Sequence, residues 1–454
     1  MKDKTPTFRG QCTGAEPQAG PSHTDGVPLA EESVSSPSTE RQPSQLPTRD
    51  RLDTSLRWTL AVDQGIGCLG LYTLLPVLGV LLASRTTTSG ATYVGLGLFC
   101  YSASAGLSAM ILNRWLSRLT YLRGMAGSML LTAVAFGALA YVSSGPAMCA
   151  LLAVAGLGVS SHYLVSRVLI AEELQTNLSR NRMYSMLQVA VNVAAAAGPF
   201  IGGFLIFIDA RLLMAAVAAC YVLAGAAVLL GVPAALRPAP VTSTWPISGA
   251  TVRRSCTDPA FRRLLLIGAT GAFVYGHFYS AIALFVAQDF AHTTLQGALI
   301  AGPALLIAVS QGAVTKVVAR VLQQGWTPFA VLLAGALTFS VALFALGLGL
   351  PLLTGTIVGL SIFAVAEMVF APMQSTAFAA LDTASAFESF NLRQVCWTLG
   401  EALGTLAGGS LFLAAYRGGH QHAYWLVLAT VVIVLTGGFA WNSRAATRGP
   451  QPLP

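Results

Sequence analysis

The chain has 454 residues, of which 54% are hydrophobic and 10% charged, and its mean hydropathy is +0.66. Soluble domains carry about 25% charged residues, so this composition excludes a soluble protein and predicts an integral membrane protein. The net charge of +8 comes from basic residues spread over loops without interleaved aromatic residues, which excludes a nucleic-acid partner.

The N-terminal stretch differs in composition from the rest of the chain. Residues 1–55 are rich in Pro, Ser, Thr, Gln and Glu and hold too few large apolar residues to build a core. No apolar run opens the chain, so we do not expect a cleaved signal peptide. We expect 1–55 to be a disordered cytoplasmic tail.

Long runs without any charged residue follow this tail. A bilayer core of about 30 Å needs roughly 20 apolar residues per helix, so the two longest runs must each hold two helices. These runs are 124–166 and 321–366, and glycines and prolines mark a turn in each. With one further stretch that contains a single carboxylate, the sequence predicts an all-α fold of twelve transmembrane helices, at 57–83, 91–112, 124–142, 146–171, 183–207, 211–232, 264–288, 296–318, 328–349, 352–377, 393–415 and 422–441.

The basic residues fall mostly on one side of the predicted helices. The outer loops hold Arg85, Arg211 and Arg417. The inner loops and the C-terminal tail hold Arg114, Arg118, Arg123, Arg180, Arg182, Arg237, Arg253, Arg254, Arg262, Arg263, Lys316, Arg320, Arg393, Arg444 and Arg448. Cytoplasmic loops retain positive charge, so we expect both termini in the cytoplasm and the protein in the inner (plasma) membrane. Abundant Arg, Ala and Gly with few Lys suggest a bacterium with a GC-rich genome.

One motif occurs twice, in the fifth and eleventh predicted helices. Its pattern, Q-V…A-x-G-x-x-x-G-G-x-L, begins at Gln188 and again at Gln394. Six helices separate the copies, so both run in the same direction, which indicates two parallel six-helix bundles. Chance recurrence of Gly-x-x-x-Gly in glycine-rich membrane helices is the alternative. The predicted domains are an N-terminal bundle at 56–232, a cytoplasmic linker at 233–263, a C-terminal bundle at 264–443 and a tail at 444–454.

The glycines of this motif are candidates for close helix packing. Without side chains they let a neighbouring helix approach, which offsets the propensity cost of glycine. They are Gly198, Gly202 and Gly203 in the first copy and Gly404, Gly408 and Gly409 in the second. Pro199 is expected to bend the fifth helix, and Thr405 replaces it in the eleventh.

Five ionisable residues lie inside the predicted helices and are candidates for carrying a proton. They are Asp63, Glu367, Glu401, His162 and His277. A carboxylate inside a membrane helix is costly unless it is neutralised, paired or wet, so each is a functional candidate. Imidazole titrates near neutrality and can share a proton path. The alternatives are structural hydrogen bonds for the glutamates and histidines, and an inner latch between Asp63 and Arg167 or a loop arginine.

Polar and aromatic residues at similar depth are candidates for lining a substrate cavity. The aromatic run around His277 offers Tyr275 and Phe278 to a flat or cationic substrate. Gln188, Asn192 and Gln394 offer hydrogen-bonding groups. Ordinary core packing and satisfied contacts between helices remain the alternatives.

The sequence lacks the motifs of common enzymes and metal sites. It contains no nucleophile elbow, phosphate-binding loop, HExxH or paired Cys/His spacing, and its seven cysteines are scattered. We therefore expect a protein that is not an enzyme and that uses no cofactor and no metal.

These features resemble the major facilitator superfamily, and in particular its twelve-helix drug:proton antiporters of the bacterial multidrug-efflux group. The resemblance rests on Gly198 to Gly203 (GPFIGG), on Asp63 with the glycines that follow it, on Gly156 to Gly158 with Arg167, and on Ala366 to Pro372. The family's loop between the second and third helices carries an acidic residue where this chain has Asn113, beside Arg114 and Arg118. Asn113, Arg114, Arg118 and Arg167 are therefore candidates for an inner latch that departs from the family's pattern.

The resemblance implies a monomeric secondary transporter in the lipid bilayer. It would export a small organic molecule such as a drug, an antibiotic or another metabolite in exchange for protons. Two alternatives stay open. One is uptake of a sugar, peptide or metabolite by proton symport, and the other is a membrane sensor or assembly partner that does not transport.

Overall fold

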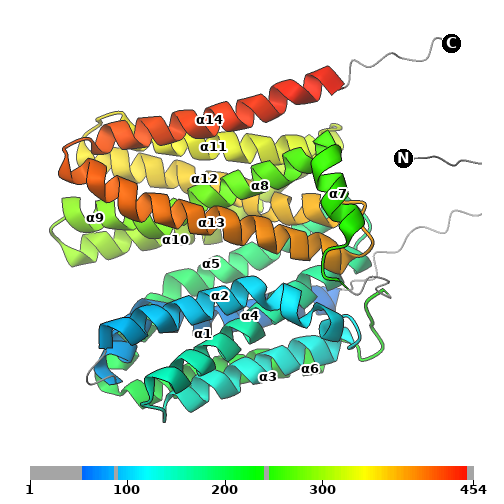
Figure 1. Ribbon diagram of the computed structural model, residues 1–454, viewed down its shortest axis with the longest axis vertical. Coiled ribbons are helices and arrows are strands. Elements are labelled where there is room, and N and C mark those ends of the chain that lie inside the picture. The colour runs from blue at the N-terminus through cyan, green and yellow to red at the C-terminus, as the bar shows by residue number, and fades with distance from the viewer. Residues whose placement is uncertain (1–53, 86–89, 240–244, 447–454) are drawn as a thin grey trace, which may run out of the picture. The chain divides into compact units, whose positions relative to one another are not determined.

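A computed structural model describes residues 54–85, 90–239 and 245–446 of the chain. The predicted tail at 1–55 lies outside the described residues except for its last two positions, and so do 447–454 of the predicted C-terminal tail. Every regular element of the described part is a helix, as the all-α prediction requires (Figure 1).

The first six helices pack on one another. They are α1 (Thr54–Arg85), α2 (Gly90–Leu116), α3 (Tyr121–Leu139), α4 (Gly145–Glu173), α5 (Asn177–Ile208) and α6 (Ala210–Gly231). Helix α1 lies against α5 and α6, α2 lies against α4, and α3 lies against α4 and α6. We call these helices the first group.

The remaining membrane helices form a second group above the first in Figure 1. They are α8 (Pro259–His277), the π-helical turn η1 (Phe278–Ile282), α9 (Ala283–Asp289), α10 (Thr293–Gln323), α11 (Pro328–Gly347), α12 (Leu352–Ala379), α13 (Ala386–Arg417) and α14 (Gln421–Ala446). Because α8, η1 and α9 follow one another without a break, they form a single span, Pro259–Asp289. Helix α13 packs on α8, and α11 packs on α12 and α14.

The number of spans agrees with the sequence. Eleven helices of the described part are long and apolar enough to cross a membrane. The twelfth is α2, which is bent by 48° between Leu96–Ser108 and Met110–Leu116. The protein is therefore an all-α membrane protein with twelve transmembrane helices. The domain boundaries proposed from the repeat stay a prediction.

Several helices begin earlier than their apolar runs. Helix α5 starts at Asn177, where 183 was predicted, and α13 starts at Ala386, where 393 was predicted. Thr176 and Ser385 cap these helices, because each hydroxyl accepts a hydrogen bond from a backbone N–H of the first turn. Arg180 and Arg393, which were assigned to loops, therefore lie inside helices.

The glycine motif brings α5 against α1 and α13 against α8. A Cβ added at Gly198 would lie 2.6 Å from the backbone carbon of Tyr72, and one at Gly202 would collide with the carbonyl oxygen of Thr73. In the second group, a Cβ added at Gly404 would collide with the carbonyl oxygen of Phe273, and one at Gly408 would collide with the side-chain oxygen of Ser280. The third glycine of each copy, Gly203 or Gly409, has no such neighbour within 4 Å in the part of the chain that the structure describes, so the close approach uses two glycines per copy, where three were predicted.

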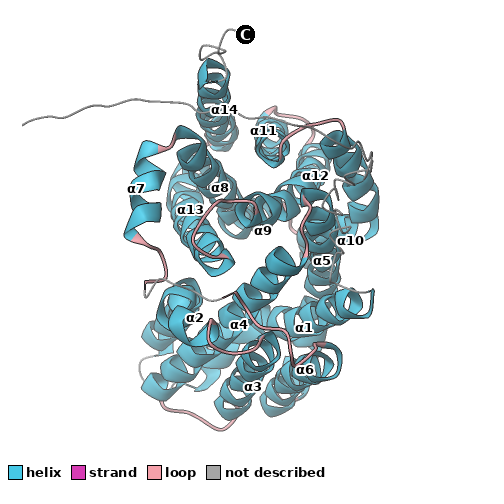
Figure 2. Ribbon diagram, turned by 90° about the vertical axis from the view of Figure 1, so that its right-hand side faces the viewer, coloured by secondary structure: helices cyan, strands magenta, loops and turns pink. Residues whose placement is uncertain are grey.

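The short helix α7 (Gly249–Thr257) lies in the predicted linker and was not expected. The Arg254 guanidinium donates to the backbone oxygen of Asp382 at 2.6 Å, and Glu388 Oε1 accepts from the Ser248 N–H at 2.6 Å. The pKa of the Arg254 side chain is raised, first by its hydrogen bond to Asp382. These contacts fix the linker against the segment that joins α12 to α13. In the end-on view, α7 lies outside α8 and α13 (Figure 2).

Candidate functional site

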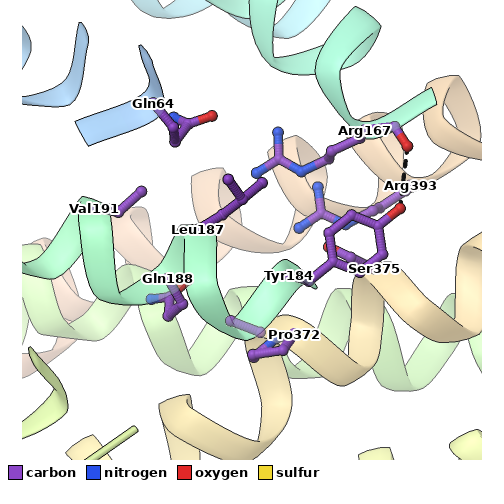
Figure 3. Close-up of a pocket in the computed structure, with 10 residues that line it drawn as sticks. Gln64, Arg167, Tyr184, Leu187, Gln188, Val191, Pro372, Ser375 and Arg393 are labelled. Atoms are coloured by element: carbon purple, nitrogen blue, oxygen red, sulfur yellow. Dashed lines mark hydrogen bonds between the residues drawn. The ribbon is translucent and has the colours of Figure 1, made fainter. Parts of the chain in front are cut away.

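A small cavity lies where the two groups meet, because α5 packs on α10 and α12 while α13 packs on α2 and α4. Its volume is about 40 Å³. Four helices besides α5 line it, through Gln64 of α1, Arg167 of α4, Ser375 of α12 and Arg393 of α13 (Figure 3). The remaining lining residues are Tyr184, Leu187, Gln188 and Val191 of α5 and Ala371 and Pro372 of α12.

A second cavity of about 10 Å³ has Arg167 and Arg393 in its wall as well, together with Ser160, Leu164, Phe390 and Gln394. The predicted cavity residues Gln188 and Gln394 thus line the first and the second cavity. Asn192 is buried, and its side-chain amide donates to the backbone oxygen of Gln188 at 2.9 Å, which is a contact within its own helix.

Glu367 lies beside the first cavity and links the two groups. Its Oε1 atom accepts a hydrogen bond of 2.8 Å from the Gln188 side-chain amide. Glu367 belongs to α12 and Gln188 to α5, so this bond joins one group to the other. The Tyr275 hydroxyl reaches the same oxygen at 3.5 Å. A proton gained or lost by this carboxyl group would therefore change a contact between the groups.

Aromatic residues surround Tyr275 on the Glu367 side. The ring centroid of Tyr275 lies 5.2 Å from that of Trp397 and 6.5 Å from that of Phe363. Phe278 packs on Phe363 at 5.4 Å, within the second group. Tyr275 thus contacts Glu367, whereas Phe278 contacts Phe363 and does not line either cavity.

Asp63 and His162 form a buried pair within the first group. Asp63 Oδ2 lies 2.7 Å from His162 Nε2, and both side chains are almost fully buried. The other carboxylate oxygen, Oδ1, has no hydrogen-bond partner among the described residues. Asp63 therefore pairs with His162, five residues before Arg167 on α4, and not with Arg167 or a loop arginine, which was the alternative considered for it.

Arg167 and Arg393 approach the cavity from opposite groups. The Arg167 guanidinium lies 5.2 Å from the ring centroid of Tyr163 and donates to the backbone oxygen of Tyr163 at 3.4 Å. The Arg393 guanidinium lies 5.6 Å from the ring centroid of Trp397, and its Nε atom has no partner in the described part of the chain. Neither arginine belongs to an ion pair found there. The sequence did not single out several residues of this wall, among them Gln64, Tyr184, Ser375 and Arg393. Arg393 was missed because a charge at the start of an apolar run reads as a loop residue.

Two further candidates for carrying a proton, His277 and Glu401, do not line either cavity. His277 is buried, its Nδ1 atom donates to the backbone oxygen of Phe273 at 2.8 Å, and its Nε2 atom lies 2.9 Å from the Tyr424 hydroxyl. Both ring nitrogens are therefore used inside the second group. Glu401 is half-buried on α13, where its backbone packs against Gly276. Among the described residues, no cluster of three or more His, Cys, Asp or Glu side chains could hold a metal ion.

The groups also meet at the end of the helices where α1 begins and α14 ends, which we call the inner end. Asn113 accepts a hydrogen bond of 2.9 Å from Asn391, so the asparagine that replaces an acid makes a neutral bridge between α2 and α13. Arg180 donates to the backbone oxygens of Ala171 at 2.8 Å and of Ala379 at 3.3 Å, and thereby ties the ends of α4 and α12 together. Arg114 and Arg118 are exposed.

Twelve membrane helices around a buried polar cavity define a membrane transporter. Residues 64–405 match the Major Facilitator Superfamily, and the chain belongs to this family. Its members and structural neighbours are transporters, so the protein is a transporter of small molecules and not an enzyme.

The chain is 25% identical over 386 residues to the multidrug resistance protein MdtH of Aeromonas hydrophila, covering 83% of this chain and 92% of that protein. Its fold is similar to the crystal structure of the human organic anion transporter MFSD10 (TETRAN), with a TM-score of 0.65 and 17% identity over 87% of this chain and 100% of that one. It is also similar to the transporter FucP in the outward conformation, with a TM-score of 0.67 and 14% identity over 87% of this chain and 99% of that one.

Proposed function

We propose that the protein is a proton-coupled secondary transporter that exports a small organic molecule from the cytoplasm. It would work as a monomer in the plasma membrane, with both termini in the cytoplasm. The observation that carries this proposal is the hydrogen bond between Glu367 and Gln188, because it joins a carboxyl group of one helix group to a cavity-lining side chain of the other.

The proton would act by changing the strength of this link. A hydrogen bond to a carboxylate is roughly twice as strong as one between neutral groups. Loss of the proton from Glu367 therefore strengthens the contact between the groups, and its gain weakens the contact. A ligand shifts an equilibrium only when it binds one state more tightly than the other. The proton would therefore drive alternating access, because the contact between the groups differs in strength between protonated and deprotonated Glu367. The buried Asp63 and His162 pair is a second candidate proton site.

Export is supported by the name of the Aeromonas relative, a multidrug resistance protein, which covers most of this chain. The experiment is to express the chain in a drug-sensitive bacterium and to measure accumulation of a broad compound panel with and without an uncoupler. Wild-type protein should lower the accumulation of at least one compound, and the uncoupler should abolish this effect. Export would be refuted by equal accumulation of every compound under both conditions.

The variant Glu367→Gln tests the proposed role of the carboxyl group. It keeps the size and hydrogen-bonding capacity of the side chain but cannot exchange a proton, so we expect proton-driven export to fall to background. Exchange of cargo across the membrane without a gradient should persist, because the cavity is intact. Asp382→Asn is the control, since the Asp382 carboxylate is 90% exposed and lies outside the site. Normal proton-driven export by Glu367→Gln would remove Glu367 from this role.

The two cavity arginines favour a second candidate function, uptake by proton symport. A negatively charged cargo and a proton balance one another's charge, so a cationic cavity beside a protonatable carboxyl group suits their movement in the same direction. Flux in inverted membrane vesicles separates the candidates. An inward proton gradient drives cargo in the opposite direction in an exporter and in the same direction in a symporter.

A further inference from the structure

We propose that the cargo of this transporter is a small organic anion whose carboxylate or phosphate group binds between Arg167 and Arg393. This inference rests on the proposed transport function and names its substrate class. It differs from the flat or cationic substrate that the aromatic residues suggested.

The residues that line the site give it a positive charge. Arg167 and Arg393 line both cavities, and no carboxylate of the described residues lies in the wall of either one. Arg393 is only 7% exposed, and its Nε atom lacks a partner among the described residues. Arg167 beside it is half-buried and donates to the backbone oxygen of Tyr163. An uncompensated buried charge is strongly destabilising, so the buried Arg393 with a second arginine in the same wall indicates a site for a negative partner.

The two arginine side chains suit an anion in both their chemistry and their direction. The two guanidinium groups point the same way, into the space beside Leu187 (Figure 3). A guanidinium presents several N–H donors in a fork that matches the oxygens of a carboxylate or phosphate. Ser375 in the same wall offers a hydroxyl group to a further oxygen of the cargo, while the Tyr184 hydroxyl donates to the backbone oxygen of Arg167 at 3.1 Å.

The two arginines belong to opposite helix groups. A cavity of about 40 Å³ holds only a few water molecules, since one water needs about 10–15 Å³, so the cargo must enter when the groups lie further apart. Bringing two cations together in a medium of low dielectric constant is unfavourable. An anion between them removes this repulsion, and it would thus promote closure of the groups around itself.

The experiment compares compounds that share a skeleton but differ in charge. The probes are naphthalene-2-carboxylate, its methyl ester, 2-naphthylmethylammonium and 2-naphthyl phosphate, together with the corresponding benzene and quinoline series. Energy-dependent export and uptake are both measured in cells that express the full chain and in cells that carry an empty vector. We expect the carboxylates or the phosphates to be transported in preference to the esters and amines, and comparison of the carboxylate with the phosphate shows which anionic group binds. Transport of esters or amines without anions would overturn the anion site but leave the transport function standing, whereas no transport in either direction in any series would count against the transport function itself.

Variants of the arginines then test the contact. Arg393→Gln or Arg167→Gln should weaken binding of an exported anion by roughly tenfold to a hundredfold, because each removes a hydrogen bond to a charged group. Binding of the methyl ester to the same purified variant should be unchanged, which also shows that the variant is folded. Arg393→Lys should recover part of the affinity, and Arg123→Gln, which changes an exposed arginine on α3, serves as the control. Equal losses for anion and ester in Arg393→Gln would assign the arginine a structural role and contradict the proposal.

Discussion

At the scale of single residues, the contacts separate candidates that look alike in the sequence. Asp63, His162 and Glu367 could be selected from the sequence because ionisable residues are rare inside apolar runs. Their partners could not be predicted, since Asp63 and His162 are 99 positions apart and meet only because α1 and α4 belong to one packed group. Arg393 was missed because a charge near the start of an apolar run reads as a loop residue, whereas the cap at Ser385 extends α13 two turns further.

The Asp63 and His162 pair yields a prediction about stability. Replacing His162 with Leu leaves the Asp63 carboxylate buried without its partner, and removing one member of a buried pair costs about 3–5 kcal/mol. The double variant Asp63→Asn/His162→Leu should recover much of this loss, because no buried charge is left. Thermal unfolding of the purified single and double variants measures the difference. Losses that simply add in the double variant would show that the pair is not coupled.

At the scale of helices, the sequence predicts the spans well and their ends poorly. The apolar run sets the part of each helix inside the bilayer, so all twelve spans could be located. The polar first turns of α5 and α13 depend on capping, and the short helix α7 is too polar to stand out by hydropathy. Pro199 lies inside α5, and its effect on the balance of conformations stays a prediction.

The glycine motif offers a matched test on a single helix. A methyl group at Gly202 would collide with the carbonyl oxygen of Thr73, while one at Gly203 would meet none of the described residues within 4 Å. Overpacking of this kind costs about 1–3 kcal/mol, so Gly202→Ala should lower the thermal stability of the purified protein. Gly203→Ala should leave stability unchanged or raise it slightly, because alanine favours the helix. Equal effects of the two substitutions would mean that α1 and α5 do not approach closely at Gly202.

At the scale of the whole molecule, apolar contacts and hydrogen bonds join the two helix groups at the inner end. Phe387 and Phe390 of α13 enter a hydrophobic cluster built mainly from the first group, and the ring centroids of Tyr184 and Phe390 lie 6.3 Å apart. The hydrogen bonds of Asn113 with Asn391 and of Arg180 with Ala379 lie in the same region. For transport by alternating access, these contacts must break in each cycle.

A reversible cross-link tests whether the inner end opens. Asn113 and Asn391 are in direct contact, so the double variant Asn113→Cys/Asn391→Cys should form a disulfide under mild oxidation. We expect the cross-link to stop transport and a reducing agent to restore it, while either single variant under the same oxidation keeps its activity. Full transport by completely cross-linked protein would exclude opening at this end.

We propose that movement of cargo is coupled to a proton through Glu367. Proteoliposomes that contain the purified full chain and a pH-sensitive dye in the lumen test this coupling when a transported compound is added on one side. We expect the compound to move protons across the membrane with wild-type protein and not with Glu367→Gln, although that variant still exchanges the compound. Cargo movement without any proton movement in wild-type protein would exclude coupling to a proton.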